Sequence, residues 1–152
     1  MTEAYDVEIL LVEDNPYDAE LALRAFAKHR LASHVVVVAD GKEALDFLFA
    51  RGVYQGTSLN SGPKVILLDL NLPKVDGHEV LKAIKSDPKL KRLPVIILTT
   101  SKEERDVVES YQLGANSYIV KPVDYDQFLS IIDQLGVYWL VLNEPPVQDT
   151  PA

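Results

Sequence analysis

Five short apolar segments are spaced along the chain, and stretches with helical periodicity lie between them. These segments are Val7 to Val12, Val35 to Val38, Val65 to Leu68, Val95 to Leu98, and Ser117 to Val120. They are continuously apolar rather than alternating, which is typical of strands buried on both faces of a parallel sheet. The pattern therefore predicts five parallel strands inside an α/β domain.

A helical pattern with a start signal follows each predicted strand. The starts are Asn15-Pro16, Asp40 with Glu43, Gly77, Ser101 with Glu104, and Asp124 with Gln127. Such residues supply side-chain caps, or a preset proline, for a first helical turn. The third helix is expected to end at Ser86, the fourth near Gly114 and the fifth near Leu142. Five repeats of strand and helix predict a doubly wound α/β fold with right-handed crossovers.

Two segments carry neither pattern. Residues 52–63 are polar and rich in Gly and Ser, which predicts a long loop. Residues 143–152 include Pro145-Pro146 and little apolar material, so we expect a mobile or extended tail. A chain of 152 residues is a usual size for one domain. We therefore expect a single domain over residues 1–142 and a C-terminal tail over residues 143–152.

Composition excludes several classes of function. A net charge of −8 argues against wide contact with nucleic-acid phosphates, which needs clustered Lys and Arg. The absence of cysteine excludes disulfides, thiolate metal sites and cysteine nucleophiles. No apolar run approaches the roughly 18 residues of a membrane span, and the N-terminus lacks the basic region of a signal peptide. We expect a cytoplasmic protein that binds neither nucleic acid nor membrane.

Polar side chains stand where four of the predicted strands end. The first strand is followed by Glu13-Asp14, the third by Asp69, the fourth by Thr99-Thr100 and the fifth by Lys121-Pro122. In open parallel sheets, ligands bind beyond the carboxyl ends of the strands. Three acids, a hydroxyl and a lysine are therefore expected at one edge of the sheet.

The charges of this group indicate its chemistry. Three neighbouring carboxylates repel one another unless a cation lies among them, and oxygen ligands without Cys or a nearby His favour Mg²⁺. A carboxylate beside such an ion can attack phosphorus and form an aspartyl phosphate. Lys121 and Thr99 would then offer an ammonium and a hydroxyl to the phosphoryl oxygens. Glu13-Asp14 alone could equally be acids at a helix start, but beside Asp69 the metal site is the better interpretation.

In these residues the chain resembles the receiver domains of two-component response regulators, over residues 6 to 135. The resemblance is carried by Glu13-Asp14, Asp69 to Pro73 with Gly77, Thr99, and Tyr118 to Pro122. It implies a flavodoxin-like fold whose five strands lie in the order 2-1-3-4-5. The long loop before the third strand and Tyr138-Trp139 further resemble stand-alone regulators that serve phytochrome-type histidine kinases.

The resemblance also implies a role for each matching residue. Asp69 would accept a phosphoryl group from a kinase histidine. Mg²⁺, or Mn²⁺ or Ca²⁺ in its place, would be held by Asp14, Asp69 and the backbone carbonyl of Asn71, with Glu13 close by. Lys121 would pair with the phosphoryl group, and Thr99 would move towards it.

Three further expectations concern the surroundings of this site. Tyr118 would change rotamer when Thr99 moves, although an aromatic residue packed in the core is the simpler interpretation. Pro122 implies a cis peptide bond after Lys121. Thr100 stands where receivers often carry a smaller residue, so its side chain could narrow the access of water.

The expected function is that of a switch rather than of an enzyme, apart from its own Mg²⁺-dependent phosphorylation and dephosphorylation. It would act by conformational change and protein binding or as a phosphate sink, with a sensor histidine kinase such as a bacteriophytochrome as partner. A phosphohydrolase of the haloacid dehalogenase type is an alternative, but Asn71 stands where such enzymes need a second Asp. A flavodoxin-like electron carrier is disfavoured because Glu13-Asp14 would repel a flavin phosphate.

The last helix predicts a homodimer. If residues 124–142 form one α-helix, a covered stripe comprises Phe128, Ile131, Ile132, Leu135, Tyr138, Trp139 and Leu142. Val137, Leu140 and Val141 then lie on the opposite side, in water. A clustered apolar patch is often an interface, so we expect a two-fold contact through the fourth helix, fifth strand and fifth helix, extended by Tyr138, Trp139, Leu140 and Val141. The alternative is that the end of the helix folds back onto its own domain.

Overall fold

The central sheet of the computed structural model has five parallel strands. The structure describes residues 3–5, 7–28, 35–59, 63–122 and 124–144, and only the backbone of residues 3–5, 57–59 and 140–142. The strands are β2 (Ile9–Val12), β3 (Val35–Val38), β5 (Val65–Leu68), β6 (Val95–Thr99) and β7 (Ser117–Val120), in the spatial order β3-β2-β5-β6-β7. The five predicted strands are confirmed, and so is the order 2-1-3-4-5 when these five are counted along the chain.

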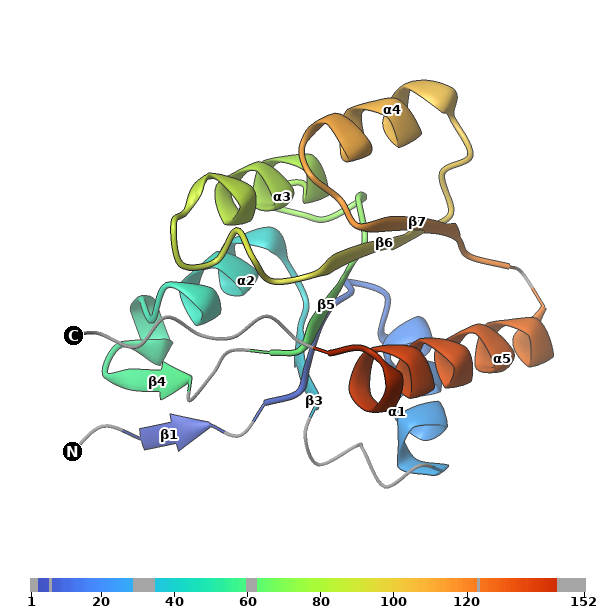
Figure 1. Cartoon of the computed structure of the whole chain (residues 1–152), viewed down its shortest axis with the longest axis horizontal. Coiled ribbons are helices and arrows are strands. Elements are labelled where there is room, and N and C mark those ends of the chain that lie inside the picture. The colour runs from blue at the N-terminus through green and yellow to red at the C-terminus, as the bar shows by residue number, and fades with distance from the viewer. Residues whose placement is uncertain (1–2, 6, 29–34, 60–62, 123, 145–152) are drawn as a thin grey trace.

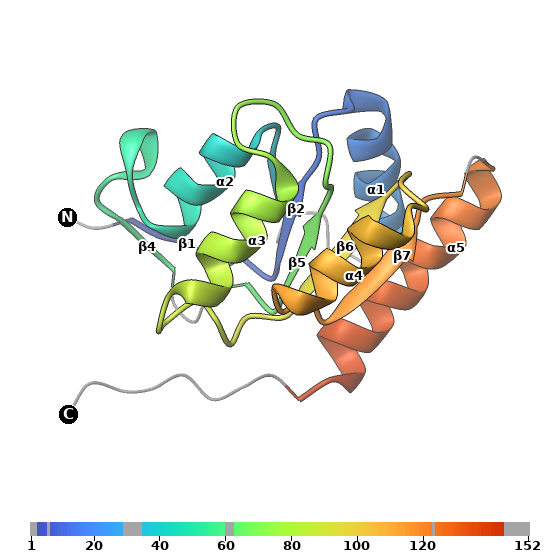
Figure 2. The same ribbon diagram turned by 90° about the horizontal axis from the view of Figure 1, so that it is seen from above.

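Two layers of helices cover the sheet (Figure 1). The helices are α1 (Pro16–Lys28), α2 (Gly41–Leu48), α3 (Gly77–Ser86), α4 (Glu104–Gln112) and α5 (Tyr125–Gly136). One apolar cluster joins the sheet to α1 and α5, and the other joins it to α2 and α3, with α4 beside α3 on the same side (Figure 2). Every residue of β2, β5 and β6 is buried, which explains their unbroken apolar sequences. In the described part of the chain, no helix is both long and apolar enough to cross a membrane.

The helix starts follow the prediction at four of five places, including α5, where the side chain of predicted cap Asp124 accepts the amide of Asp126 at 3.0 Å. The side chain of Asn15 accepts hydrogen bonds from the amides of the first turn of α1, and Asp40 accepts one from Glu43 at 2.7 Å. Helix α3 begins at Gly77 as predicted. Helix α4 begins at Glu104, two residues later than a cap at Ser101 predicts, because the Ser101 hydroxyl donates to Asp106 instead of capping Glu104.

A second, two-stranded sheet was not predicted. Strand β1 (Glu3–Tyr5) pairs in parallel with β4 (Thr57–Leu59), apart from the main sheet (Figure 1). A short 3₁₀ helix, η2 (Gly52–Tyr54), precedes β4. The prediction of a long loop is therefore wrong for residues 52–54 and 57–59, whereas residues 60–62 lie outside the described part.

The last helix reaches Leu142 as predicted but changes type on the way. Helix α5 ends at Gly136 and continues as a π-helix, η3 (Val137–Leu142). Trp139 packs against the α1–α5 side of the core, whereas Tyr138 is 50% exposed. Placing Tyr138 in the covered stripe was therefore wrong, because the stripe assumed a uniform α-helix and a π-helix has more residues per turn. The side chains of Leu140 and Val141, and residues 145–152 of the tail, lie outside what the structure describes.

The amino ends of β6 and β7 are tied together by Lys85, from the last turn of α3. Its ammonium donates to the carbonyls of Lys91 (3.0 Å) and Leu93 (2.8 Å) and to Oδ1 of Asn116 (3.2 Å). The same Oδ1 accepts the amide of Val95 at 2.9 Å. Burial lowers the pKa of Lys85. One ammonium thus links α3, the loop before β6 and the start of β7.

Candidate functional site

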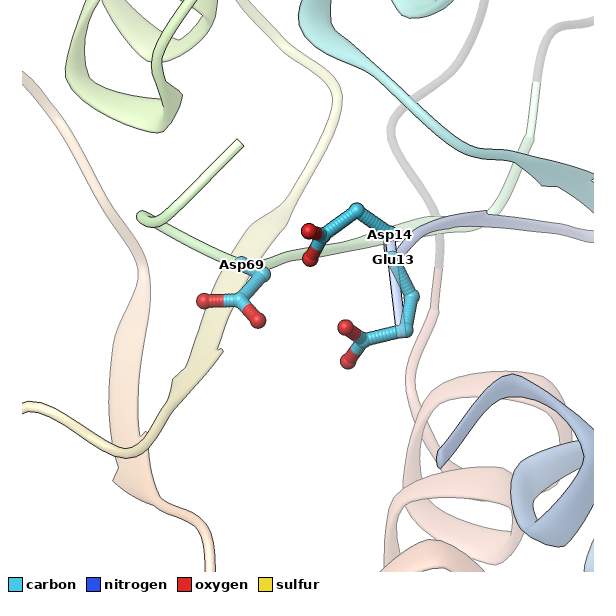
Figure 3. Close-up of side chains that lie close together, drawn as sticks. All are labelled: Glu13, Asp14 and Asp69. Atoms are coloured by element: carbon cyan, nitrogen blue, oxygen red, sulfur yellow. The ribbon is translucent and has the colours of Figure 1, made fainter. Parts of the chain in front are cut away.

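Three carboxylates meet at the carboxyl end of the sheet. Glu13 and Asp14 follow β2, and Asp69 follows the adjacent β5 (Figure 3). One oxygen atom of each lies within 4.8 Å of an oxygen of the others. The strands fix these positions, since the amide of Glu13 donates to the carbonyl of Val38 at 3.0 Å and that of Asp69 to the carbonyl of Val12 at 3.1 Å. Glu13 and Asp69 are buried and Asp14 is exposed, so the cluster opens to solvent on one side.

A buried lysine binds this cluster. Lys121 follows β7, and its amide donates to the carbonyl of Thr99 at 2.7 Å. Its ammonium donates to Asp69 Oδ2 at 3.0 Å, to Glu13 Oε1, and to Asp18 Oδ2 at 3.1 Å. Burial by itself lowers the pKa of Lys121, but the hydrogen bond that it donates to Glu13 and the charges of Asp69 and Glu13 outweigh burial and raise the pKa above the usual value. Lys121 is therefore a fixed positive charge beside Asp69.

For Glu13, burial raises the pKa and the contact with Lys121 lowers it, the reverse of what burial and ionic contacts do to the pKa of Lys121. Burial raises the pKa of Glu13 to about 7, although the hydrogen bond and the charge of Lys121 oppose this shift. The negative charge of Asp69 adds to the rise. A carboxylate held at such a site is stabilised by additional positive charge, because a cation favours the ionised form.

The donor set fits a hard divalent cation. Glu13, Asp18 and Asp69 contact the single ammonium of Lys121, and Asp14 lies beside Glu13 and Asp69, so negative charge is in excess. Converging oxygen ligands with one open side are typical of Mg²⁺ and similar ions, which retain several waters. The backbone amide of Asn71 donates to Asp69 Oδ1 at 3.2 Å, so Asn71 lies in the turn that follows Asp69. The role of its carbonyl as a ligand stays a prediction.

Of the two predicted switch residues, Tyr118 makes a hydrogen bond through its hydroxyl, whereas the Thr99 hydroxyl makes none in the described structure. Thr99 is completely buried, and its hydroxyl has no hydrogen-bond partner in the part of the protein described. The Tyr118 hydroxyl donates to the carbonyl of Ser101 at 3.0 Å, and burial raises the pKa of this phenol. Thr100 is exposed at the end of β6. The structure thus places an unsatisfied hydroxyl at the strand end next to Asp69.

The predicted cis peptide bond at Pro122 is not observed. The described backbone contains no cis peptide, so the Lys121–Pro122 bond is trans. The trans form of a bond before proline is favoured by about 0.5–1 kcal/mol. The three carboxylates around its ammonium already orient Lys121 from this trans backbone.

The turn that follows Asp69 lies close against Gly77, the first residue of α3. The amide of Gly77 donates to the carbonyl of Leu70 at 2.9 Å, and a Cβ at Gly77 would lie 2.4 Å from the carbonyl oxygen of Asp69. No side chain fits at that distance. This explains why the Asp69 block continues to a glycine at position 77.

Sequence reasoning missed Asp18. This residue lies in the first turn of α1, where an acid is expected simply because it favours the positive end of the helix dipole. A usable signal was its spacing, since a residue four positions after Asp14, on a helix that starts at the same sheet edge, lies near the strand ends. Its contact with Lys121 joins residues 103 positions apart in the chain.

Comparisons with known proteins agree with this site. The model of the response regulator receiver domain family matches residues 9–133. The chain is 41% identical to the probable methanogenesis regulatory protein FilR2 of Methanothrix harundinacea, over 91% of this chain and 86% of that protein. It is 40% identical to the response regulator Rcp1 of Synechocystis, over 87% of this chain and 88% of that protein.

Solved structures show the same fold. The Mn²⁺-bound form of Rcp1 superimposes with a TM-score of 0.85 at 38% identity, covering 93% of this chain and 99% of that one. The phosphorylated cyanobacterial phytochrome response regulator RcpA gives a TM-score of 0.85 at 43% identity, covering 97% and 100% of the two chains. The bacteriophytochrome response regulator AtBRR is 51% identical with a TM-score of 0.67, covering 95% and 99%.

These relatives are regulators rather than enzymes, and none of them supports the phosphohydrolase alternative. Receiver domains bind a divalent metal ion, in agreement with the cluster of Glu13, Asp14 and Asp69. Fold, site and sequence therefore lead to one conclusion: the chain belongs to the receiver domain family of two-component response regulators.

Proposed function

We propose that Asp69 is the phosphoacceptor and that a sensor histidine kinase supplies the phosphoryl group. The observation that carries this proposal is the contact of Asp69 with Lys121, at 3.0 Å, inside a group of converging carboxylates at the sheet edge. Glu13 is the other buried acid in contact with Lys121, but it follows β2, whereas Asp69 follows β5, the middle strand of the five.

The transfer is a displacement at phosphorus. An Asp69 carboxylate oxygen attacks the phosphorus of a phosphohistidine, an O–P bond forms and the P–N bond breaks, and the electron pair returns to the imidazole, which takes up a proton from water. Lys121 holds the acceptor in place and offsets charge on the phosphoryl oxygens. Asp14, Asp69, the carbonyl of Asn71 and the nearby Glu13 would hold Mg²⁺, or Mn²⁺ or Ca²⁺ in its place. When bound, the ion supplies positive charge to the transferring phosphoryl group.

The response to phosphorylation is proposed to begin at Thr99. Its buried hydroxyl has no partner before transfer and would donate to a phosphoryl oxygen afterwards. Tyr118 would then leave the carbonyl of Ser101 and change rotamer, which alters the surface between α4 and β7. Thr100, exposed beside this path, would limit the access of water.

A phytochrome-type kinase is the proposed partner. Among the similar regulators, RcpA is a cyanobacterial phytochrome response regulator and AtBRR is a bacteriophytochrome response regulator. The comparable identity to FilR2 means that identity alone does not select the kinase. Phosphotransfer from a panel of purified histidine kinases, with a bacteriophytochrome among them, tests this proposal. Transfer that is fastest from a kinase without a bilin-binding module would contradict it.

The phosphoacceptor is tested by replacing Asp69 with Asn, which removes the nucleophile and nearly preserves its shape. With Mg²⁺ and acetyl phosphate, the unaltered protein should gain one acid-stable, base-labile phosphoryl group, and the variant none. Asp46→Asn is the control, since Asp46 pairs with Lys42 on α2, away from the site. Labelling of Asp69→Asn to the level of the unaltered protein would show that the acceptor lies elsewhere.

We also propose a homodimer through α4, β7, α5 and the π-helix η3. The support is a set of exposed apolar side chains on these elements: Val108, Tyr111, Tyr125, Val137 and Tyr138. Sedimentation equilibrium at micromolar concentration should give a dimer, and Val137→Asp with Tyr138→Asp should give a species near 16.9 kDa. Val53→Asp is the control, because Val53 is also apolar, and more exposed than Val137, but lies on η2. A monomer before and after phosphorylation would rule out the dimer.

A further inference from the structure

We infer that Asp18 is a positioning residue that holds the Lys121 ammonium in its resting place and releases it when the phosphoryl group arrives. This inference rests on the proposed role of Asp69. Asp18 acts through Lys121 and touches no reacting atom.

The ammonium of Lys121 is fully occupied in the resting protein. A lysine ammonium has three N–H donors and no acceptor. Glu13, Asp69 and Asp18 each accept one hydrogen bond from it, the last two at 3.0 and 3.1 Å. A phosphoryl oxygen on Asp69 can be bound by this ammonium only after one of the three bonds is given up.

Asp18 is the partner whose release costs least. Its side chain is 23% exposed, against 4% for Glu13 and 8% for Asp69, so water can replace the lost hydrogen bond. Glu13 is also held by the amide of Asn15 at 3.1 Å, and Asp69 carries the phosphoryl group itself. The Asp18 carboxylate lies in the first turn of α1, where the free amides of the helix start stabilise a negative charge after release.

The charges at the site also favour release of Lys121 from Asp18 when the phosphoryl group arrives. A phosphoryl group brings further negative charge to a place where three carboxylates already contact one ammonium. The Asp18 carboxylate, adjacent to that ammonium, competes with the phosphoryl oxygens for it. Removing the charge of Asp18 should therefore favour the phosphorylated state over the resting state.

The test uses beryllium fluoride, which forms a tetrahedral, phosphoryl-like complex on a carboxylate oxygen, at saturating Mg²⁺. Asp18→Asn should bind it more tightly than the unaltered protein, by roughly three- to tenfold, the range expected for a partly exposed ion pair. Asp18→Glu should restore most of the original affinity. Glu20→Gln is the matched control: it removes one carboxylate from the same helix, where Glu20 is 59% exposed and pairs with Arg24, and should leave the affinity unchanged.

A double-mutant cycle separates action through Lys121 from a general effect of charge. In Lys121→Met, the tighter binding caused by Asp18→Asn should disappear, because no ammonium remains to be released. The same cycle on urea unfolding in EDTA reports the resting contact without metal, and the two substitutions should be non-additive. If Lys121→Met binds beryllium fluoride too weakly to measure, the unfolding cycle alone decides whether Asp18 acts through Lys121.

The outcomes distinguish the inference from the proposed function. Failure of the unaltered protein to bind beryllium fluoride, or binding that survives Asp69→Asn, would overturn the role of Asp69. The role of Asp18 would be overturned, with Asp69 still the acceptor, if the unaltered protein binds beryllium fluoride but Asp18→Asn binds it no more tightly than Glu20→Gln, or more weakly than the unaltered protein. Additive effects of Asp18→Asn and Lys121→Met would overturn the role of Asp18 in the same way.

Discussion

Replacing Thr99 with Val should stabilise the resting protein. Thr99 is 0% exposed, and its hydroxyl has no hydrogen-bond partner in the described structure. Valine has nearly the same shape and carries a methyl group in place of the hydroxyl. The substitution therefore removes a buried, unsatisfied polar group without opening a cavity, and keeps a β-branched residue in strand β6.

The magnitude follows from two contributions. An unsatisfied buried hydroxyl costs about 1–3 kcal/mol, and burying a methyl group in its place contributes about 0.8 kcal/mol. Imperfect fit of the methyl group offsets part of this gain, so we expect a net stabilisation of about 1–2 kcal/mol. For a chain of 152 residues this corresponds to a rise in melting temperature of about 3–6 °C.

Urea unfolding in EDTA measures this difference directly, provided that the slope m stays the same. Thr100→Val is the control, because Thr100 is exposed and its substitution should change stability by no more than about 0.5 kcal/mol. Thr99→Val should also keep phosphorylation but lose the response of Tyr118. A variant that is less stable than the unaltered protein would show that the Thr99 hydroxyl is satisfied at rest, and the energetic argument for its movement would be refuted.

Two further predictions concern the metal and the lysine. Asp14→Ala should weaken Mg²⁺ binding at least tenfold, that is by about 1.4 kcal/mol, because it removes the exposed carboxylate of the cluster from an ion that has few protein ligands; an unaltered Mg²⁺ titration would count against the site. Lys121→Ala should keep Mg²⁺ binding, since the lysine is no ligand, but uncouple phosphorylation from the movement of Tyr118. Titration with Mg²⁺ checks that Lys121→Ala still binds the ion, and the NMR spectrum of the phosphorylated variant checks that Tyr118 no longer moves. A spectral change on phosphorylation equal to that of the unaltered protein would contradict the loss of movement.

The parallel sheet could be predicted because its strands are buried on both faces, and burial leaves a direct mark in segments such as Val65 to Leu68. Strands β1 and β4 left no such mark. Their sequences, EAY and TSL, are three residues long and contain no apolar run. They are defined by pairing with each other across more than fifty residues, and pairing of that kind has no local signal.

The same contrast holds within the site. Asp69, Glu13 and Lys121 could be found because each follows a recognisable strand, and the topology of a parallel sheet brings those ends together. Asp18 could not be ranked above other acids in first turns of helices, since its role depends on a side-chain contact with Lys121. The state of the bond before Pro122 and the π-helix at Val137 also depend on the whole fold, because the local sequence permits either form.

The link made by Lys85 has a mechanical consequence for the sheet. It fastens the amino ends of β6 and β7 through Asn116, far from the cluster at the opposite ends of these strands. Near the carboxyl ends, the Thr99 hydroxyl has no hydrogen-bond partner among the described residues, and the Tyr118 hydroxyl donates to the Ser101 carbonyl of the loop before α4. The backbones of β6 and β7 stay paired at these ends, where the Lys121 amide donates to the Thr99 carbonyl, so the two strands are joined along their whole length. A change at Asp69 is therefore expected to reach the loop before α4 through the side chains of Thr99 and Tyr118, because the strands themselves are held in register.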